Sequence, residues 1–315
     1  MHTTLKIGTR ESQLAVWQAT LVKNLLKEHR VDSELVFIKS EGDIDLKTPL
    51  YEMGVQGIFT KTLDAALINN RIDIAVHSMK DVPTQLASGV TQAAVLKRAS
   101  YKDLLVLKGE LSTAKDILSS PFAIHHSPFT IATSSIRRKA QWLHKYPHHQ
   151  IHNLRGNVNT RLQKLQSENW DAAIFAAAGL ERINLRPQNS IELDWMLPAP
   201  AQGAIVIVCR EYDNETKEKC FLLNDENTAL CTKIEKEFLR TLLGGCSTPI
   251  SALAEIEEDE LFFRGNIFSL DGKRKAEVEK IIPIEMENHL GEIAAEELLR
   301  NGGQQIADEI RNAAK

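Results

Sequence analysis

The chain has 315 residues, of which 43% are hydrophobic and 25% are charged, and its formal net charge is −4 at pH 7. This length exceeds that of a usual single domain, so we expect two or three packed domains. The acidic balance argues against a general nucleic-acid or anionic-membrane surface, since either requires a broad excess of Lys and Arg. Any anion site is therefore expected to be local.

The N-terminal residues Met1–Lys6 lack the basic and then apolar run of a secretory signal, and no stretch approaches the roughly 20 apolar residues that span a bilayer. We expect a cytoplasmic protein with no membrane partner. Four cysteines are too few for a disulfide framework, and none has a zinc-ligand spacing, so we predict free thiols and no metal site. They are Cys209, Cys220, Cys231 and Cys246.

The first 200 residues alternate short β-branched runs with helical patterns, which predicts α/β layers. Ser12 is the expected N-cap of the first helix, whose apolar positions recur at helical spacing from Leu14 through Trp17 and Leu21 to Leu25. The predicted strands are Leu5–Thr9, Glu34–Lys39, Asp73–His77, Thr130–Thr133 and Ala172–Phe175.

Residues 42–57 have no sustained period and contain Gly and Pro at intervals, which is typical of a functional or mobile segment, and we interpret them as a lid. Further along, the apolar run Ala204–Cys209 follows a Pro-rich break and is expected to rejoin the first sheet. The chain would then cross between lobes twice. The remaining pattern predicts a smaller α+β domain with a helix at Thr228–Leu242, strands at Ile250–Glu257 and Leu261–Phe268, and a C-terminal helix from Glu292.

Charged and hydroxyl side chains gather where predicted strands pass into helices, the edge at which open α/β sheets bind ligands. Arg10 and Ser12 stand at the first junction, and together they could clamp an anion at a helix N-terminus; an ordinary cap beside a solvated arginine is the alternative. Lys80 and Asp81 follow a buried strand, where they are either a surface ion pair or, for Asp81, a catalytic carboxylate.

Three further junctions carry most of the arginines. Thr133, Ser134 and Ser135 precede Arg137 and Arg138, whose positive charges in a first helical turn oppose the helix dipole and so favour an anion as the reason for their presence. The other two junctions contribute Arg155, Arg161 and Arg182. Six arginines at four strand ends indicate a ligand with many carboxylates rather than independent solvated surfaces.

Cys246 lies in Gly244-Gly245-Cys246-Ser247-Thr248-Pro249, between a predicted helix and a predicted strand. The glycines and proline favour an exposed loop, and an accessible thiol can act as a nucleophile once ionised. Cys209, by contrast, is expected to be a small buried apolar residue. The histidines at 144, 148, 149 and 152 lack a carboxylate or cysteine at ligand spacing and indicate a solvated loop.

Together these segments resemble the hydroxymethylbilane synthase (porphobilinogen deaminase) family along essentially the whole chain. The motifs are Gly-Thr-Arg-Glu-Ser, Ala-Val-His-Ser-Met-Lys-Asp-Val-Pro, Thr-Ser-Ser-Ile-Arg-Arg, Leu-Arg-Gly-Asn-Val-Asn-Thr-Arg, Pro-Ala-Gln-Gly-Ala and Gly-Gly-Cys-Ser-Thr-Pro-Ile. The resemblance implies a transferase that joins four porphobilinogen molecules head to tail, with loss of ammonia, on a dipyrromethane cofactor held by a thioether to Cys246.

The resemblance also assigns roles to residues. It implies that Asp81 stabilises charge on pyrrole nitrogen and helps move protons. Cofactor and substrate carboxylates would be bound by Arg10, Ser12, Lys80, Thr133, Ser134, Ser135, Arg137, Arg138, Arg155, Arg161 and Arg182. Within the lid, many relatives have Arg before Gly42 and lysines at the positions of Glu52 and Gln56, so the lid of this chain is less positive.

Three domains follow from the resemblance, the first two similar to the paired lobes of periplasmic solute-binding proteins. We expect domain 1 at 1–98 with 200–217, domain 2 at 99–199, and domain 3, which carries Cys246, at 218–315. The rival classes are a non-catalytic two-lobed binding protein for a polycarboxylate and a phosphate-ester transferase, although the chain has no P-loop and no acidic metal pair. No apolar stripe demands association, so we expect a monomer.

Overall fold

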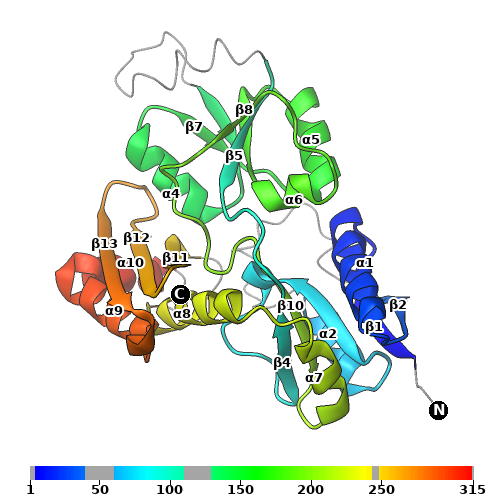
Figure 1. The fold of residues 1–315 in the computed structure, drawn as a ribbon. Coiled ribbons are helices and arrows are strands. Elements are labelled where there is room, and N and C mark those ends of the chain that lie inside the picture. Colours follow the sequence, from blue (N-terminus) through cyan, green and yellow to red (C-terminus); the bar gives the residue numbers. More distant parts are fainter. Residues whose placement is uncertain (1–3, 40–59, 110–128, 243–247, 314–315) are drawn as a thin grey trace.

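The computed structural model describes residues 4–39, 60–109, 129–242 and 248–313, which form three units, each around its own sheet (Figure 1). The predicted lid at 42–57 and Cys246 lie outside the described residues. The fold class is α/β, with two lobes built on mixed five-stranded sheets and a smaller α+β unit. No helix within the described ranges is long and apolar enough to cross a membrane.

The first sheet has the strand order β2-β1-β3-β10-β4. Strand β1 pairs in parallel with β2 and β3, whereas β10 runs antiparallel to both β3 and β4. Helices α1 and α7 cover one face and α2 the other, each against its own apolar cluster. The bounds are β1 (Leu5–Thr9), α1 (Gln13–Glu28), β2 (Ser33–Phe37), α2 (Lys61–Ile68), β3 (Ile74–Ser78), β4 (Val90–Val95), β10 (Ile205–Arg210) and α7 (Asn214–Phe221).

Helix α1 begins where the sequence predicts, because the Ser12 hydroxyl accepts the backbone N–H of Ala15 at 3.4 Å. Its buried face differs from the predicted stripe. Ala15, Ala19, Val22 and Leu26 are buried, while Trp17, Leu21 and Leu25 are only partly buried and pack at the edge of the cluster. The small alanines let the helix lie close to the sheet, so the larger side chains flank the contact.

The second sheet repeats the first, with the order β7-β6-β8-β5-β9. Three parallel strands are again followed by an antiparallel one, here β5, which pairs with β8 and β9. The bounds are β5 (Asp103–Leu107), β6 (Thr130–Ala132), α4 (Ile136–Lys145), β7 (Gln150–His152), α5 (Val158–Ser167), β8 (Ala172–Ala176), α6 (Ala177–Glu181) and β9 (Ser190–Glu192). This structural repeat has no counterpart that we could detect in the sequence.

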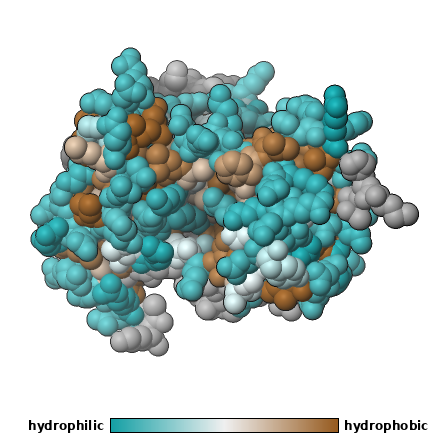
Figure 2. Space-filling view, turned by 60° about the horizontal axis from the view of Figure 1, so that its bottom comes forward, coloured by the Kyte–Doolittle hydropathy of each residue, from teal (hydrophilic) through white to brown (hydrophobic). Residues whose placement is uncertain are grey.

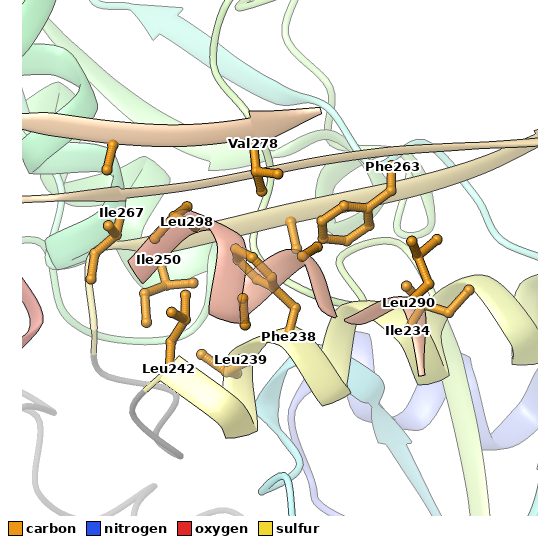
Figure 3. Close-up of a cluster of buried hydrophobic side chains, with 14 of the residues drawn as sticks. Ile234, Phe238, Leu239, Leu242, Ile250, Phe263, Ile267, Val278, Leu290 and Leu298 are labelled. Carbon is orange, nitrogen blue, oxygen red and sulfur yellow. The ribbon is translucent and has the colours of Figure 1, made fainter. Parts of the chain in front are cut away.

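The third unit packs α8 and α9 against one face of an antiparallel three-stranded sheet. In Figure 3, Phe238 and Leu239 of α8 point toward Phe263 and Val278 of the strands, and Leu290 and Leu298 complete the same cluster. The bounds are α8 (Glu226–Leu242), β11 (Ile250–Glu257), β12 (Glu260–Phe268), β13 (Lys275–Pro283), α9 (Leu290–Leu298) and α10 (Gln304–Ala313). The order confirms the predicted helix, two strands and C-terminal helix, and adds β13.

Two crossover segments, residues 96–102 and 193–204, join the two lobes, and β10 returns the chain to the first sheet as predicted. Helix α8 binds both segments through Glu235, which is fully buried. Its carboxylate accepts both Nη groups of Arg98, at 2.6 and 3.1 Å, and the backbone N–H of Ala201 at 2.6 Å. One side chain of the third unit thus fixes the path of both crossovers.

The surface in Figure 2 is mostly hydrophilic, with hydrophobic residues in separate patches. The three described cysteines are free and buried, which confirms the thiol prediction for Cys209, Cys220 and Cys231.

Gly203 provides a test of how tightly the second crossover segment is packed. Its φ is +89°, and a Cβ placed there would lie 2.6 Å from the carbonyl oxygen of Ala99. Gly302 has a similar φ of +100° but nothing within 4 Å of such a Cβ. We expect Gly302→Ala to cost about 1 kcal/mol from φ alone. Gly203→Ala should lower the Tm, followed by circular dichroism, distinctly more, because the backbone must also move; equal losses would contradict this packing.

Candidate active site

Lys80 and Asp81 lie in a single 3-10 turn, Met79–Asp81, at the carboxyl end of the central strand β3. Asp81 is exposed, whereas Lys80 is half-buried and donates from Nζ to Oε1 of Gln202 at 3.3 Å. Burial lowers the pKa of Lys80 to about 8, against the opposing effect of the neighbouring Asp81 carboxylate. The two residues are therefore adjacent but differently solvated, which favours distinct roles.

Arg137 and Arg138 are both buried, and both bind a carboxylate that the sequence analysis did not identify. Asp103 accepts Nη2 of Arg137 at 2.7 Å on one oxygen and Nη2 of Arg138 at 2.7 Å on the other. Asp103 thus supplies an internal counter-charge, so the positions of these two arginines do not by themselves require a bound anion. One carboxylate for two guanidinium groups still leaves an excess positive charge at the end of the sheet.

Backbone carbonyls accept further hydrogen bonds from this pair. Arg137 donates to the carbonyl oxygen of Leu197 at 2.7 Å, and Arg138 to that of Ile174 at 2.9 Å. Burial acts to raise the pKa of Asp103, but the guanidinium charges of Arg137 and Arg138 outweigh it and hold that pKa well below its ordinary value. The aspartate is therefore ionised at neutral pH.

The three hydroxyl residues before α4 serve the local backbone. Ser135 caps the helix by accepting the N–H of Arg138, Ser134 accepts the N–H of Leu154 at 2.8 Å, and Thr133 accepts the N–H of Ser135 at 3.2 Å. Each hydroxyl oxygen is thus an acceptor within the protein. Its O–H can still donate to an anion, since a hydroxyl does both at once.

Arg155 and Arg161 flank the N-terminus of α5, whose cap is Asn157. Arg155 is buried, and Arg161 donates from Nε to the carbonyl oxygen of Gly156 at 2.7 Å. Burial lowers the pKa of Arg161 to about 10, with Arg138 acting in the same direction and Asp81 against it. Arg161 of the second lobe therefore lies within electrostatic reach of Asp81 of the first.

Arg182 and Arg10 lie at the remaining junctions. Arg182 donates to the carbonyl oxygen of Gly203 at 2.7 Å, and its guanidinium lies 5.8 Å from the ring centre of Trp17. Burial lowers its pKa to about 10. Arg10 follows β1, and its charge, added to the larger effect of burial, lowers the pKa of His77 to about 4. Arg182 therefore links the second crossover to α1, and Arg10 lies close enough to His77 of β3 to affect its charge.

The site has the character that a polycarboxylate requires. Within the described residues, no carboxylate oxygen lies within 4.0 Å of the side-chain nitrogens of Lys80, Arg161 or Arg182. In addition, Nε of Arg137 is buried without a hydrogen-bond partner. Guanidinium and ammonium groups held in place without a paired acid are suited to bind the acid groups of a ligand. Cys246, the expected attachment point, lies outside the described residues.

Other candidates are placed elsewhere. A pocket of about 430 Å³ lies between α8 and the segment after β3, lined by apolar groups such as Val82, Val206 and Val208, and contains none of the predicted site residues. Across the described part of the chain, no group of three or more His, Cys, Asp or Glu could hold a metal. Of the four clustered histidines, His144, His148 and His152 are exposed as predicted, although His144 lies in α4 and His152 in β7. His149 is half-buried and stacks on Tyr146 at 5.0 Å, so the prediction of a solvated side chain is wrong for that residue.

The sequence analysis missed Asp103 and Gln202. Asp103 begins the all-buried strand β5, and an acidic residue before an apolar run is the signal that could have identified a buried counter-charge. Gln202 is the glutamine of the Pro-Ala-Gln-Gly-Ala motif, but the sequence offered no signal for its contacts. Both are almost completely buried, at 0% and 1% exposure.

Removing the acid from the buried triad gives a direct test of this arrangement. Asp103→Asn should lower the free energy of unfolding by about 3 to 5 kcal/mol, because two guanidinium groups remain buried without a counter-charge. The pKa of Asp103 is lower in the folded than in the unfolded protein. The extra stability of the wild type over Asp103→Asn is therefore fully present above the ordinary pKa of 3.8, and it is lost as the pH falls below that value.

The matched control is Asp194→Asn, which breaks an ion pair with Lys102 at a side chain that is 73% exposed. It should change stability little at any pH. Urea unfolding at several pH values measures both variants, and equal losses for the two would refute a special role for Asp103.

Comparison with solved structures returns two-lobed ligand-binding proteins. The methionine-binding protein MetQ has a TM-score of 0.43 and 14% identity, covering 70% of this chain and 89% of that one. A periplasmic VFT2 domain of BvgS from Bordetella pertussis has a TM-score of 0.40 and 12% identity, covering 69% and 84%. Likenesses at this level add nothing to the site.

Sequence comparison is decisive. Residues 5–218 match the family model described as porphobilinogen deaminase, dipyromethane cofactor binding domain, and residues 229–300 match that of the porphobilinogen deaminase C-terminal domain. Relatives named porphobilinogen deaminase include those of Chloroherpeton thalassium, 37% identical over 99% of both chains, and Chlorobium phaeobacteroides, 39% identical over 99% of both. The chain belongs to the porphobilinogen deaminase family.

Proposed function

We propose that the residues gathered at the strand ends of the two lobes carry out the reaction of this family. That reaction is a transfer: hydroxymethylbilane synthase condenses four porphobilinogen molecules head to tail, releases ammonia and yields linear hydroxymethylbilane for tetrapyrrole biosynthesis, on a dipyrromethane cofactor. The observation that supports the assignment of roles is a set of half-buried cations from both lobes, Lys80, Arg161 and Arg182, near which the described residues place no carboxylate oxygen within 4.0 Å.

Binding of acid groups follows from this charge distribution. Arg137, Arg138, Arg155 and Arg161 approach from the second lobe and Lys80 from the first. Each charge-assisted hydrogen bond to a carboxylate contributes roughly 1.5 to 3 kcal/mol before solvent discounting. The hydroxyls of Ser12, Thr133, Ser134 and Ser135 donate to the same groups, and Arg10 and Arg182 extend the basic surface along the crossover and α1.

Asp81 is the catalytic residue of the proposal. It is exposed at the end of β3, next to Lys80 and within the field of Arg161, so its carboxylate faces the region where substrate acid groups bind. Loss of ammonia from porphobilinogen places positive charge on the pyrrole nitrogen. A carboxylate that accepts the ring N–H stabilises that charge and can take up a proton when the new ring is restored to neutrality.

The cofactor is proposed to be attached to Cys246 by a thioether. When bound, it supplies the free pyrrole carbon to which the first substrate is joined. The chain's own residues then bind acid groups, orient the reacting rings and hold Asp81 in position. In the sequence, Gly244 and Gly245 directly precede Cys246, and such small residues suit an anchor whose attached chain lengthens by four rings.

The domain limits are likewise proposed, at 1–98 with 200–217, 99–199 and 218–315. The three separate sheets and the return of β10 to the first lobe support them. A cytoplasmic location and a monomeric state are the remaining proposals, supported by the composition and by the separation of apolar patches on the surface in Figure 2.

Mass spectrometry of the purified protein tests the cofactor assignment. We expect a two-pyrrole adduct on the peptide that contains Cys246 and none on peptides with Cys209, Cys220 or Cys231, which are buried. Cys246→Ser should lack the adduct and the activity. Active protein without the adduct would defeat the assignment, and a two-lobed binding protein for polycarboxylates would carry no adduct either.

Asp81→Asn tests the catalytic role. The amide keeps the shape of the side chain but removes its charge, so kcat should fall by about 10²- to 10⁴-fold while KM changes less. Asp259→Asn, in the exposed turn between β11 and β12, is the matched control and should leave both constants unchanged. A kcat for Asp81→Asn close to that of wild type would exclude it as the acid/base group.

A further inference from the structure

The Pro-Ala-Gln-Gly-Ala motif has no part in the proposed function, yet its glutamine lies between the two lobes. Gln202 is in the second crossover segment and is 1% exposed. A buried amide must satisfy one acceptor and two donor positions to avoid a cost of about 1 to 3 kcal/mol for each that is left unmade. The contacts of Gln202 therefore indicate what this position is built to do.

All three positions are satisfied, by groups from different parts of the chain. Oε1 accepts Nζ of Lys80, at 3.3 Å, from the first lobe. Nε2 donates to Oδ1 of Asp103, at 2.9 Å, in the second lobe, and to the carbonyl oxygen of Tyr101, at 2.7 Å, in the first crossover segment. One planar group thus touches a cation on one side and an anion on the other.

The anion that Gln202 contacts is the one that holds the arginine pair. Oδ1 of Asp103 also accepts Nη2 of Arg138 at 2.7 Å, while its Oδ2 accepts Nη2 of Arg137. The connection from Lys80 through Gln202 to Asp103 and the two arginines is therefore continuous and uses only buried or half-buried groups. It crosses from the first lobe to the second without passing through solvent.

Few side chains could replace this amide. A glutamate would have no donor for Asp103, a lysine no acceptor for Lys80, and an asparagine would be one methylene short. The backbone of Gln202 is also fixed, since its carbonyl oxygen accepts Nε of Arg98 at 2.9 Å, and Arg98 is itself held by Glu235. The amide therefore has little freedom to turn away from either partner.

We propose that Gln202 is a positioning residue for the carboxylate-binding cations. Its amide fixes the ammonium of Lys80 relative to the Asp103–Arg137–Arg138 triad, so that cations from both lobes meet the acid groups of the substrate at set separations. This rests on the proposed function, because Lys80 and the arginine pair are taken there to bind the substrate. Gln202 itself touches no substrate and acts through Lys80 and Asp103.

The test compares two buried glutamines in the holoenzyme, with cofactor content checked by mass. Gln202→Met removes the amide at nearly constant volume. Gln141→Met is the matched control: Gln141 is 3% exposed, and its side chain makes three hydrogen bonds, to Leu197 and Ser251, and none to Lys80 or Asp103. The Leu197 carbonyl also accepts from Arg137, so the control retains the direct partner of that arginine while losing a buried amide. We expect Gln202→Met to raise the KM for porphobilinogen about tenfold, with a smaller change in kcat, and Gln141→Met to raise KM clearly less.

A double-mutant cycle shows whether Gln202 acts through Lys80. Added to Lys80→Met, the Gln202→Met change should raise KM clearly less than it does in the wild-type chain, because the lysine partner is already absent. Strictly additive effects would mean that the two residues act independently and would overturn the inference.

The pH dependence of KM distinguishes a positioning role of Gln202 from a packing role. It also provides a test through Gln202→Glu if Gln202→Met folds poorly. In the wild type we expect KM to rise above a pH near 8, where Lys80 loses its proton. In Gln202→Met this rise should begin at a lower pH, because the ammonium of Lys80 has lost a hydrogen-bond acceptor. The rise should begin at a higher pH in Gln202→Glu, which places a carboxylate there. If neither variant moves the profile, or if both match Gln141→Met in KM, Gln202 is merely structural. Condensation of porphobilinogen by the wild type tests the proposed function separately.

Discussion

A fully buried carboxylate determines where the basic groups of this protein lie. Asp103 has no exposure to water, and taking an isolated carboxylate into such surroundings costs several kcal/mol unless charged partners and hydrogen bonds replace the lost hydration. Arg137, Arg138 and Gln202 are those replacements. Two guanidinium groups are thereby fixed at the end of the second sheet, next to the crossover that leads back to the first lobe.

Backbone carbonyl groups orient four arginines of the site, and two of these, Arg137 and Arg138, also bind Asp103. Backbone carbonyl oxygens of Leu197, Ile174, Gly156 and Gly203 each accept from one arginine of the site. A carbonyl fixes the direction of a guanidinium but leaves its charge in place, whereas a carboxylate would cancel it. Positive charge is therefore held ready for an anionic chain, and burial makes it stronger by excluding solvent.

Much of this arrangement could be predicted from the sequence, and the features that could not be predicted have physical explanations. All five predicted strands of the first 200 residues occur, and Ser12, Ser135 and Asn157 cap helices, because alternation and capping are local signals. Strands β4, β5, β7 and β9 were missed, since β5 is an apolar run without a distinctive period, β4 does not alternate, and β7 and β9 have only three residues each. The partners of Arg137 and Lys80 were invisible because Asp103 and Gln202 lie 34 and 122 residues away along the chain.

The return of β10 between β3 and β4 affects the order in which the lobes can form during synthesis. Strands β5 to β9 of the second sheet are all made by Glu192, but the first sheet lacks an inner strand until Arg210 has left the ribosome. Emerging segments fold as soon as their partners are available. The lobe that begins the chain is therefore completed after the one inserted into it, and until then the facing edges of β3 and β4 are without their partner.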